Sequence, residues 1–322
     1  LTLIRDGRLF YRGHDATALA RQASLEETAA LLWDAGRADA FPAAAPVLPD
    51  AYASLLAADT GAIEAMLPLV AVAAPDDATA EWQSDPVRLA RGCGDLVRIV
   101  AAAAAGAPGS AAPIHAQLAA AWGVGGDAAD HIRAALVLCA DHELNASGFT
   151  ARCIASAGAS LRASVLGGLA ALGGVRHGAI TGRVDAFWDS PASASPAGLR
   201  ALLQAGGDIP GFGHPLYPDG DIRAKALLDG ILPDFAEAAD LVAAVEDLTG
   251  RRPSIDFALV ALRRHLGLPP GAAFRIFAVG RSVGWIAHAL EQRATRQLIR
   301  PRAIYTGIEP LDPAPAAGSG QD

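Results

Sequence analysis

The sequence predicts an all-α fold, and three observations support this prediction. Apolar residues make up 52% of the 322 positions and charged residues 19%, and much of the apolar share is alanine, the strongest helix former. Runs of alternating apolar and polar residues with β-branched side chains are scarce. No GxGxxG motif follows a predicted strand, so a Rossmann-type nucleotide-binding sheet is not indicated. We therefore expect about ten packed helices and hardly any strand.

The chain opens with signals for a hairpin and a capped helix. In "LIRDGRLFYRG", residues 3–13, the dipeptide Asp6-Gly7 separates two short apolar runs, as in a tight β-hairpin. The segment "SLEETAALLWDAGR" then begins a helix. Ser24 is expected to be its N-cap, and Glu27, three residues later, completes a capping box.

The next part of the chain predicts a loop and two amphipathic helices. Residues 38–50 are rich in proline, alanine and aspartate, which is typical of a loop. Asp85 and Pro86 have the types expected for an N-cap and a first-turn proline, so a helix should follow them. In "GDAADHIRAALVLCADHEL" the apolar residues fall on one helical face, and His142 stands at its C-terminal end.

Further helices are expected through the C-terminal half. One helix is predicted through "FTARCIASAGASLRASVLGGLAAL", residues 149–172, and it should end at Gly173-Gly174. Residues 190–196 are predicted as a loop, and the Pro/Ala/Gly/Ser-rich tail 308–322 as disordered. Four later helices are expected, at residues 221–231, 235–249, 254–266 and 273–296.

Composition argues against several classes of function. The formal net charge is −8 and no basic stripe is present, so nucleic acid is not an expected partner. Cys93, Cys139 and Cys153 show no CxxC spacing, which argues against a disulfide framework or zinc site and favours a reducing cytoplasm. The most apolar run, from Ile99, is alanine broken by glycine and proline, so no membrane span is expected. The chain begins at Leu1, which is compatible with an upstream segment.

Three of the eight histidines stand in unusual settings. His142 lies where a helix end meets polar residues in "ADHELNAS". His177 in "GGVRHGAI" and His214 in "GFGHPLY" are each flanked by glycines, which permit close backbone approach and positive φ. Each of them is either an ordinary structural histidine or one presented to a ligand. No HExxH motif or close pair occurs, so a metal site is not expected.

One acid and two arginine positions leave two interpretations open. Asp256 begins the apolar segment "IDFALVAL", either as an acid favoured by a helix N-terminus or as a general base in an apolar pocket. Arg281 lies on an apolar helix face, so it needs either a structural carboxylate or a bound anion. Arg300, beside Pro301, is either a solvated basic turn or a residue that reaches a site. Taken together, these residues suit proton abstraction next to a carbonyl, with neutral imidazoles stabilising the enolate.

The motifs that carry these residues resemble the citrate synthases and 2-methylcitrate synthases. The resemblance runs in order over essentially the whole chain, through "YRGHD", "SLEETAALLW", "ADHELNAS", "GGVRHGAI", "PGFGHPLYPDGDIR", "SIDF", "FAVGRSVGWIAHALEQ" and "RPRAIYTG". It implies an α-helical homodimer with a cleft between two domains. The large domain would comprise residues 1–178 plus 269–322, and the small domain residues 179–268.

The resemblance also implies a role for each matching residue. Asp256 would be the base that deprotonates acetyl-CoA, His177 would stabilise the enol, and His214 would polarise the carbonyl of oxaloacetate. Gly211 and Gly213 would line the CoA loop. No metal or redox cofactor is implied, with acetyl-CoA as co-substrate. The oxaloacetate ligands would be His142, Arg223, Arg281 and, across the dimer, Arg300.

The sequence departs from the family pattern in the loop that follows His214. The family usually has Ile or Val at Leu216, a polar or basic residue at Pro218 and Pro or Ser at Ile222, and the change at Pro218 bears on CoA phosphate binding. We expect an acyltransferase that forms citrate. Two alternatives stay open, namely a 2-methylcitrate synthase that uses propionyl-CoA, and a non-catalytic protein that binds dicarboxylates in a regulatory role.

Overall fold

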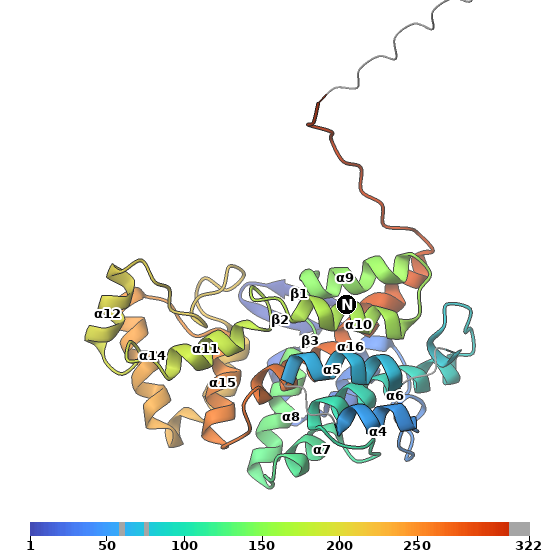
Figure 1. Cartoon of the computed structure of the whole chain (residues 1–322), viewed down its shortest axis with the longest axis horizontal. Helices are drawn as coiled ribbons and strands as arrows, with labels where there is room; N and C mark the ends of the chain where they lie inside the picture. Colours follow the sequence, from blue (N-terminus) through green and yellow to red (C-terminus); the bar gives the residue numbers. More distant parts are fainter. Residues whose placement is uncertain (58–61, 74–76, 309–322) are drawn as a thin grey trace, which may run out of the picture.

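The fold is a helical assembly with one small antiparallel sheet at its N-terminus (Figure 1). The computed structural model describes residues 1–57, 62–73 and 77–308, without the side chains of residues 62–64. The α-helices are α1 Ala16–Gln22, α2 Leu25–Trp33, α3 Arg37–Ala40, α4 Asp50–Leu56, α5 Ala62–Ala73, α6 Pro86–Ala105, α7 Ile114–Ala121, α8 Asp127–Cys139, α9 Ala146–Ser156, α10 Leu161–Leu172, α11 Ile180–Trp188, α12 Pro196–Gln204, α13 Ile222–Leu228, α14 Ala236–Thr249, α15 Ile255–His265 and α16 Ala272–Thr295. The remaining elements are strands β1 Thr2–Arg5, β2 Arg8–Tyr11 and β3 His14–Asp15 and the 3-10 helices η1 Asp77–Thr79 and η2 Leu232–Asp234.

The described residues thus contain sixteen α-helices rather than about ten. The additional ones are mostly short, such as α3 and α4, which overlap the ends of the loop predicted at residues 38–50. Helices of four to seven residues carry too few periodic positions to be recognised from sequence, because fewer than two turns define no apolar stripe. The tail predicted to be disordered lies outside the described residues, apart from Ile308.

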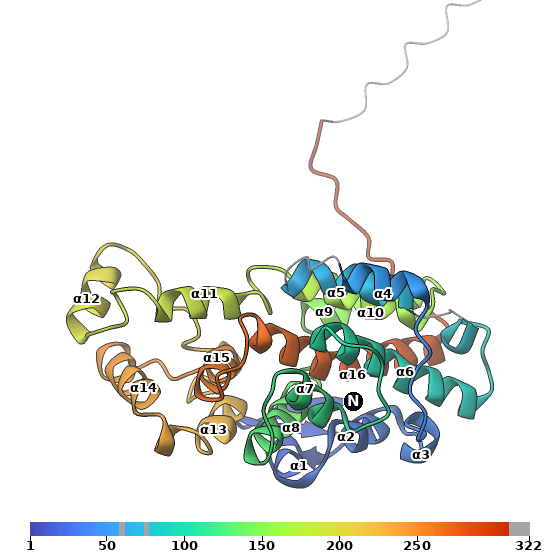
Figure 2. The ribbon, with the colours of Figure 1, turned by 60° about the horizontal axis from the view of Figure 1, so that its bottom comes forward.

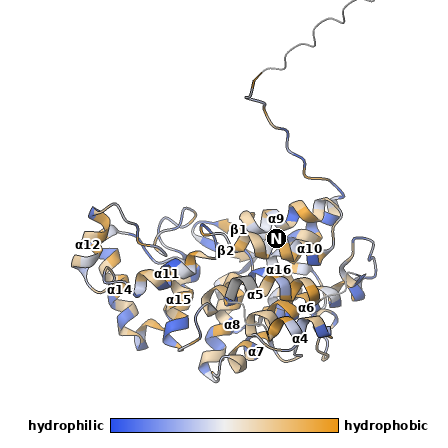
Figure 3. Cartoon of the chain, in the orientation of Figure 1, coloured by the Kyte–Doolittle hydropathy of each residue, from blue (hydrophilic) through white to orange (hydrophobic). Residues whose placement is uncertain are grey.

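The helices from α11 to α15 gather at one end of the molecule, and α16 runs through the other part (Figures 1 and 2). Most residues of α16 and of the C-terminal half of α6 are buried, and both helices belong to that larger part, which Figure 3 colours by hydropathy. The predicted boundaries of two domains stay a prediction. The arrangement matters for function because both groups carry candidate site residues. His142 and Arg281 belong to the larger part and Arg223 and Asp256 to the other, and His177 lies in the segment between α10 and α11 that joins them.

The predicted N-terminal hairpin is confirmed. Strands β1 and β2 pair antiparallel with Leu3 opposite Phe10 and Ile4 opposite Leu9. Asp6 and Gly7 both have positive φ, 51° and 69°, as the tight turn between two such strands requires. This short sheet is tied to the helical body, because the hydroxyl of Thr2 hydrogen-bonds the buried carboxylate of Asp141.

The predicted starts of α2 and α6 are also confirmed. At α2, Ser24 accepts a hydrogen bond from the backbone N–H of Glu27, whose side chain accepts from the backbone N–H of Ser24. Asp85 caps α6 in the same manner and accepts from the N–H of Arg88. Such caps are worth about 1 kcal/mol each because they satisfy N–H groups that have no partner inside the helix.

The single helix predicted over residues 149–172 is wrong, because the chain turns there. Two helices, α9 and α10, occupy the segment and are separated by residues 157–160. Gly158 has a left-handed φ of 81°, which ends α9, and Ser160 then caps α10 by accepting from the N–H of Ala163. The glycine and serine of "SAGAS" are therefore a stop and a start signal rather than two interior residues.

Helix α16 forms the centre of the larger part and approaches the end of α8 very closely. A side chain at Gly280 would place its Cβ 2.6 Å from the carbonyl oxygen of Leu136, and one at Gly284 would lie 2.5 Å from that of Ala140. Both glycines are therefore required by this contact. The contact matters for the site, because Arg281 lies between the two glycines and His142 follows the end of α8.

Candidate active site

Six of the predicted site residues line one cavity of about 310 Å³. They come from six separate places in the chain: the segment after α8, the turn between α10 and α11, the loop after α12, the start of α13, the start of α15 and the middle of α16. The six are His142, His177, His214, Arg223, Asp256 and Arg281. The volume is near the lower end of the range for small-molecule sites.

In the described part of the chain, Arg281 is a buried arginine whose charge is not paired with a carboxylate. Its side chain is 1% exposed, its Nε donates to the carbonyl oxygen of Cys139 at 2.8 Å, and its guanidinium lies over the ring of Phe277. Its Nη2 is buried and has no hydrogen-bond partner, and within the described residues no carboxylate lies at ion-pair distance. Burial lowers the pKa of this guanidinium. The charge of Asp141 acts on Arg281 from beyond ion-pair distance, so Arg281 has no directly paired carboxylate among those residues, and a bound anion would satisfy its charge.

Arg223 carries its own carboxylate partner. Its Nε and Nη2 donate to the two oxygens of Asp221 at 2.9 and 2.7 Å, and both side chains are almost fully buried. Burial opposes the charge of Arg223, but Asp221 outweighs it and raises the pKa of the guanidinium. Asp221 also accepts from the backbone N–H of Ile255, so the pair links α13 to α15. Nη1 of Arg223 takes part in neither of these bonds and remains available to a ligand in the cavity.

Asp256 lies in the first turn of α15 and also lines the cavity, and its role as a general base stays a prediction. Burial raises the pKa of its carboxyl group to about 6, against the opposing effect of Arg223. The hydroxyl of Ser254 is 3.3 Å from Oδ2. A carboxyl with a pKa near 6 is a much better proton acceptor than an ordinary aspartate, yet it is largely ionised at neutral pH.

His214 has a defined tautomer. The backbone N–H of Leu216 donates to Nδ1 of His214 at 3.2 Å, so this nitrogen carries a lone pair and the ring proton belongs on Nε2. Burial and then Arg223 lower the pKa of the imidazole, which keeps it neutral. The half-buried ring therefore offers one N–H donor, which is what a carbonyl oxygen that gains negative charge requires.

His177 belongs to a hydrogen-bonded chain with two residues that follow α8. Its Nε2 is 2.8 Å from the hydroxyl of Ser147, which in turn donates to Oδ1 of Asn145 at 2.8 Å. The ring also stands edge-on to Phe277. Burial and then Arg281 lower the pKa of His177 to about 4, so the imidazole is neutral near pH 7. Ser147 and Asn145 thus fix the orientation of a neutral ring.

His142 is held by a residue that the sequence analysis did not single out. Its Nε2 is 3.0 Å from the hydroxyl of Tyr217, and the ring stands edge-on to that of His214 with centroids 5.3 Å apart. Burial, followed by Arg223 and Arg281, lowers the pKa of His142 strongly. Tyr217 itself is buried, with its pKa raised by burial to about 12, so it keeps its proton.

The structure therefore adds Tyr217, Ser147, Asn145 and Asp221 to the predicted residues. The sequence signal for these four residues is proximity, because each lies within five residues of a predicted histidine or arginine, in "ADHELNAS" or "GHPLYPDGDIR". Their roles were not recognisable, because the partners in Ser147–His177 and His142–Tyr217 are separated by 30 and 75 residues.

The loop that carries His214 is shaped by its glycines. Gly211 and Gly213 both have φ of 84°, a conformation that side chains rarely adopt. At Gly211 an added Cβ would also lie 2.9 Å from the side chain of Val184. The N–H of Gly213 donates to the carbonyl of Arg252, which fixes the loop against the start of α15. Neither glycine lines the cavity wall, and their assignment to CoA stays a prediction.

Arg300 does not line this cavity. It lies in the segment that follows α16, where residues 300–308 are exposed and lead away from the body of the molecule (Figures 1 and 3). Its predicted role across a dimer stays a prediction. Within the described part of the chain, no helix is long and apolar enough to cross a membrane. No group of three or more potential metal ligands occurs among the same residues.

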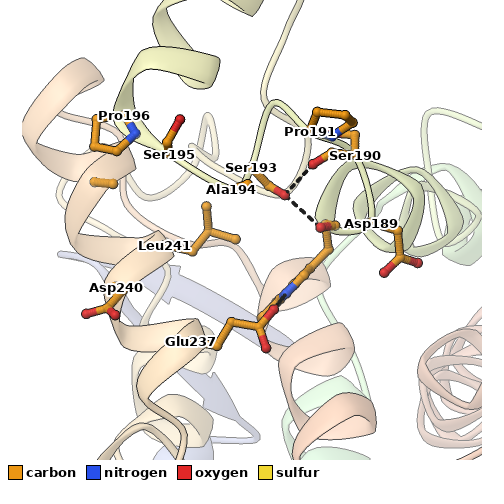
Figure 4. Close-up of a pocket in the computed structure, with 12 residues that line it drawn as sticks. Asp189, Ser190, Pro191, Ser193, Ala194, Ser195, Pro196, Glu237, Asp240 and Leu241 are labelled. Atoms are coloured by element: carbon orange, nitrogen blue, oxygen red, sulfur yellow. Dashed lines mark hydrogen bonds between the residues drawn. The ribbon is translucent and has the colours of Figure 1, made fainter.

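A larger cavity, of about 670 Å³, lies between α12, α14 and the end of α11 (Figure 4). Its carboxylates are partly engaged, because Asp189 pairs with Arg264 and Glu237 accepts a hydrogen bond from the indole of Trp188. The hydroxyl of Ser193 donates to main-chain carbonyls. This cavity has neither a histidine nor a buried unpaired cation in its wall, so it lacks the chemistry of the first one.

Comparisons with known proteins show which proteins this chain is similar to. The family described as "Citrate synthase, C-terminal domain" matches residues 1–302. A Mycobacterium tuberculosis protein, provisionally named citrate synthase 2, is 32% identical over 342 aligned residues, which cover 97% of this chain and 90% of that protein. A 2-methylcitrate synthase from Shewanella oneidensis is 33% identical over 198 residues, 56% of this chain and 52% of the relative.

The fold is shared with solved structures. A citrate synthase from Thermoplasma acidophilum, determined as a ternary complex with carboxymethyl coenzyme A and oxaloacetate, superposes with a TM-score of 0.81. The alignment covers 98% of this chain and 95% of that one at 23% identity. A similarity at this level of identity establishes a common all-α fold.

Proposed function

Since this chain belongs to the citrate synthase family, we propose that it condenses acetyl-CoA with oxaloacetate and water to give citrate and free CoA. The observation that carries this proposal is the cavity itself. One small space has a half-buried carboxylate of raised pKa, three neutral histidines and a buried arginine without an anion in its wall. These are the groups that an enolisation followed by addition to a ketone requires.

The first step would be proton removal. The carboxylate of Asp256 takes a proton from the methyl group of acetyl-CoA, while the Nδ1–H of His177 donates a hydrogen bond to the thioester oxygen. In this tautomer Nε2 carries a lone pair, so the hydroxyl of Ser147 turns from Asn145 and donates to Nε2 of the ring. A lone carboxylate is too weak a base for this carbon acid, so the donor at the oxygen is essential. The link between His177 and Ser147 keeps the ring in place during this step.

The second step would join the two substrates. The enol carbon attacks the ketone carbon of oxaloacetate, and the Nε2–H of His214 donates to the oxygen that becomes the alcohol. The two carboxylates of oxaloacetate would be held by Arg281 and Arg223, with His142 as a further donor. Water then cleaves the thioester of citryl-CoA, which releases citrate and CoA.

We also propose that the active unit is a homodimer in which Arg300 reaches the partner's cavity. The segment after α16 supports this proposal, because it exposes large apolar side chains to solvent. Ile304 is 90% exposed and Tyr305 is 70% exposed. Isolated apolar side chains on an extended segment bury little in a monomer and gain free energy when a second copy covers them.

A second candidate, 2-methylcitrate synthesis from propionyl-CoA, is favoured by the relatives that carry that name. The two reactions differ by one methylene, which a binding pocket discriminates by only about 1–3 kcal/mol. Parallel assays of thiol release with acetyl-CoA and propionyl-CoA in the presence of oxaloacetate test both. The higher kcat/KM identifies the substrate, and no release with either would overturn the proposed catalysis.

The alternative of a binding protein makes a different prediction for the same samples. Oxaloacetate would raise the melting temperature, whereas neither CoA ester would change it or release thiol. A protein that shows thiol release excludes this alternative directly.

A further inference from the structure

The wall of the cavity includes an arginine to which none of the proposed steps assigns a role. Arg176 lies in the turn between α10 and α11, directly before His177, and lines the cavity with an exposed side chain. Within the described part of the chain, its guanidinium takes part in no hydrogen bond or ion pair. Arg176 therefore has no structural role like that of Arg223, which forms an ion pair with Asp221.

The three arginines of the cavity lie at different depths. Arg281 and Arg223 are 1% and 2% exposed, so their guanidinium groups belong to the inner wall. Arg176 is exposed and therefore belongs to the opening. A small dicarboxylate held by the two inner arginines would leave the outer one free.

The wall of the cavity carries more positive than negative groups. Three guanidinium groups, those of Arg176, Arg223 and Arg281, face the cavity, and the one carboxylate in its wall is that of Asp256. Asp221 is paired with Arg223, and Asp141, which also acts on Arg281, is engaged by Thr2 and His288, and neither of these carboxylates lines the cavity. An unpaired guanidinium at a cavity opening favours an oxyanion, which it can contact with two parallel N–H groups.

We propose that Arg176 binds an oxyanion of the substrates at the opening of the cavity. This proposal rests on the proposed function, and its favoured source is a phosphate of the acyl-CoA. The acyl end of acyl-CoA must reach Asp256, so the remainder of the acyl-CoA extends outward through the opening of the cavity. Two apolar side chains next in sequence to wall residues, Val175 and Leu216, are 66% and 49% exposed and offer it contact surface. Between Gly211 and Asp221 the loop has no arginine or lysine, so it supplies no permanent cation.

The test compares Arg176→Ala with the wild type and with a matched control. Arg200→Ala is suitable, because Arg200 is also exposed but lies on α12, away from the cavity. Steady-state kinetics are measured with acetyl-CoA and with S-acetylpantetheine, a thioester without the adenosine and its phosphates. The KM for oxaloacetate is measured in the same assays.

If a CoA phosphate is the ligand, Arg176→Ala raises the KM for acetyl-CoA about tenfold and leaves that for oxaloacetate unchanged. The variant and the wild type then use S-acetylpantetheine equally well. If the carboxylate of oxaloacetate is the ligand, its KM rises instead, and the defect persists with S-acetylpantetheine. Both results support an oxyanion site at Arg176. Unchanged KM values for both substrates, as expected for Arg200→Ala, would overturn it.

Failure of the proposed function is distinguishable from failure of this inference. If the wild type releases no thiol, the melting temperature is measured with saturating CoA and with oxaloacetate. A ligand-dependent rise that is present in the wild type and in Arg200→Ala but lost in Arg176→Ala supports the site without any turnover. A rise of equal size in all three proteins, or in none, overturns it.

Discussion

The backbone N–H of Leu216 lies 3.2 Å from Nδ1 of His214 and donates a hydrogen bond to it. Because a backbone N–H can only donate, this contact excludes a proton on Nδ1 of the neutral ring and places it on Nε2. The loop thus prepares His214 as a hydrogen-bond donor before any substrate binds. A donor that is already oriented needs no reorganisation when charge develops on the carbonyl oxygen.

His214→Ala is therefore expected to lower kcat by about 10²–10³-fold, the usual cost of losing one such donor. His214→Gln should retain more activity than the alanine variant, because its side-chain amide can donate from a similar position. Thiol release under saturating substrates measures both. Equal activity of the alanine variant and the wild type would contradict the role given to this ring.

Asp256→Asn should abolish turnover and should stabilise the protein above pH 6. The carboxyl group has a pKa of about 6 when folded, against an ordinary value of 3.8. Between these values the native state binds more protons than the unfolded state, so stability falls as pH rises through this window. The asparagine variant has no carboxyl group to ionise at this position, so its stability does not fall for this reason. Its melting temperature at pH 8 should exceed that of the wild type, and the difference should disappear near pH 4.

The same pKa predicts the pH dependence of the reaction. The wild-type kcat/KM should rise with pH, with a midpoint near 6, because only the ionised carboxylate accepts a proton. Asp240→Asn, which changes an exposed carboxylate of the larger cavity, serves as the control and should alter neither the profile nor turnover. A profile that is flat from pH 5 to 8 would argue against Asp256 as the base.

Arg281→Met should abolish the binding of oxaloacetate without lowering the stability of the free protein. The variant loses the bond to Cys139 but also removes a buried charge without a partner, so its melting temperature should stay close to that of the wild type. Oxaloacetate at about 100 times its Kd should stabilise the wild type by about 2.7 kcal/mol and should not stabilise the variant.

Arg98→Met offers the converse control. Arg98 is also buried, but it donates to the carbonyls of Ala44 and Ala111, so its loss should lower the melting temperature and leave the oxaloacetate response intact. An oxaloacetate response that survives Arg281→Met would show that another group holds the anion.

Ser147→Ala should reduce kcat about tenfold by releasing the ring of His177, the cost of about one hydrogen bond. The KM for oxaloacetate should change little, because Ser147 contacts a ring assigned to the thioester. Ser164→Ala removes an equally buried hydroxyl, which donates to the carbonyl of Ser160 and does not line the cavity, and it should not affect kcat. If both variants lose the same activity, the effect of Ser147→Ala is one of packing.

The role of Arg300 across a dimer predicts complementation between two inactive variants. Neither Arg300→Ala nor Asp256→Asn should form citrate efficiently alone. In a mixed dimer, the chain with an intact Asp256 receives an intact Arg300 from its partner, so one of two sites works. Random mixing should therefore restore about one quarter of the wild-type activity, because half of the dimers are mixed. No recovery after subunit exchange would place Arg300 outside the partner's site.

Local features of the fold were predictable because they depend on neighbouring residues. The capping box of Ser24 and Glu27 and the turn at Asp6-Gly7 are satisfied within a few residues, so their sequence signals are reliable. The break between α9 and α10 was missed because Gly158 and Ser160 also occur inside helices, and only the packing of the two helices against each other decides in favour of a turn.

The sequence by itself determined the helical class, the family, and the residue types that meet in the cavity. Glycine-flanked histidines and an arginine on an apolar helix face indicated a functional site from the sequence alone. Only the tertiary structure decided what each group can do there. It paired Arg223 with Asp221 but left Arg281 without an anion, and it fixed the proton of His214 through Leu216. Charge, tautomer and pKa depend on burial and on atoms a few ångströms away, and the fold brings those atoms together from distant parts of the chain.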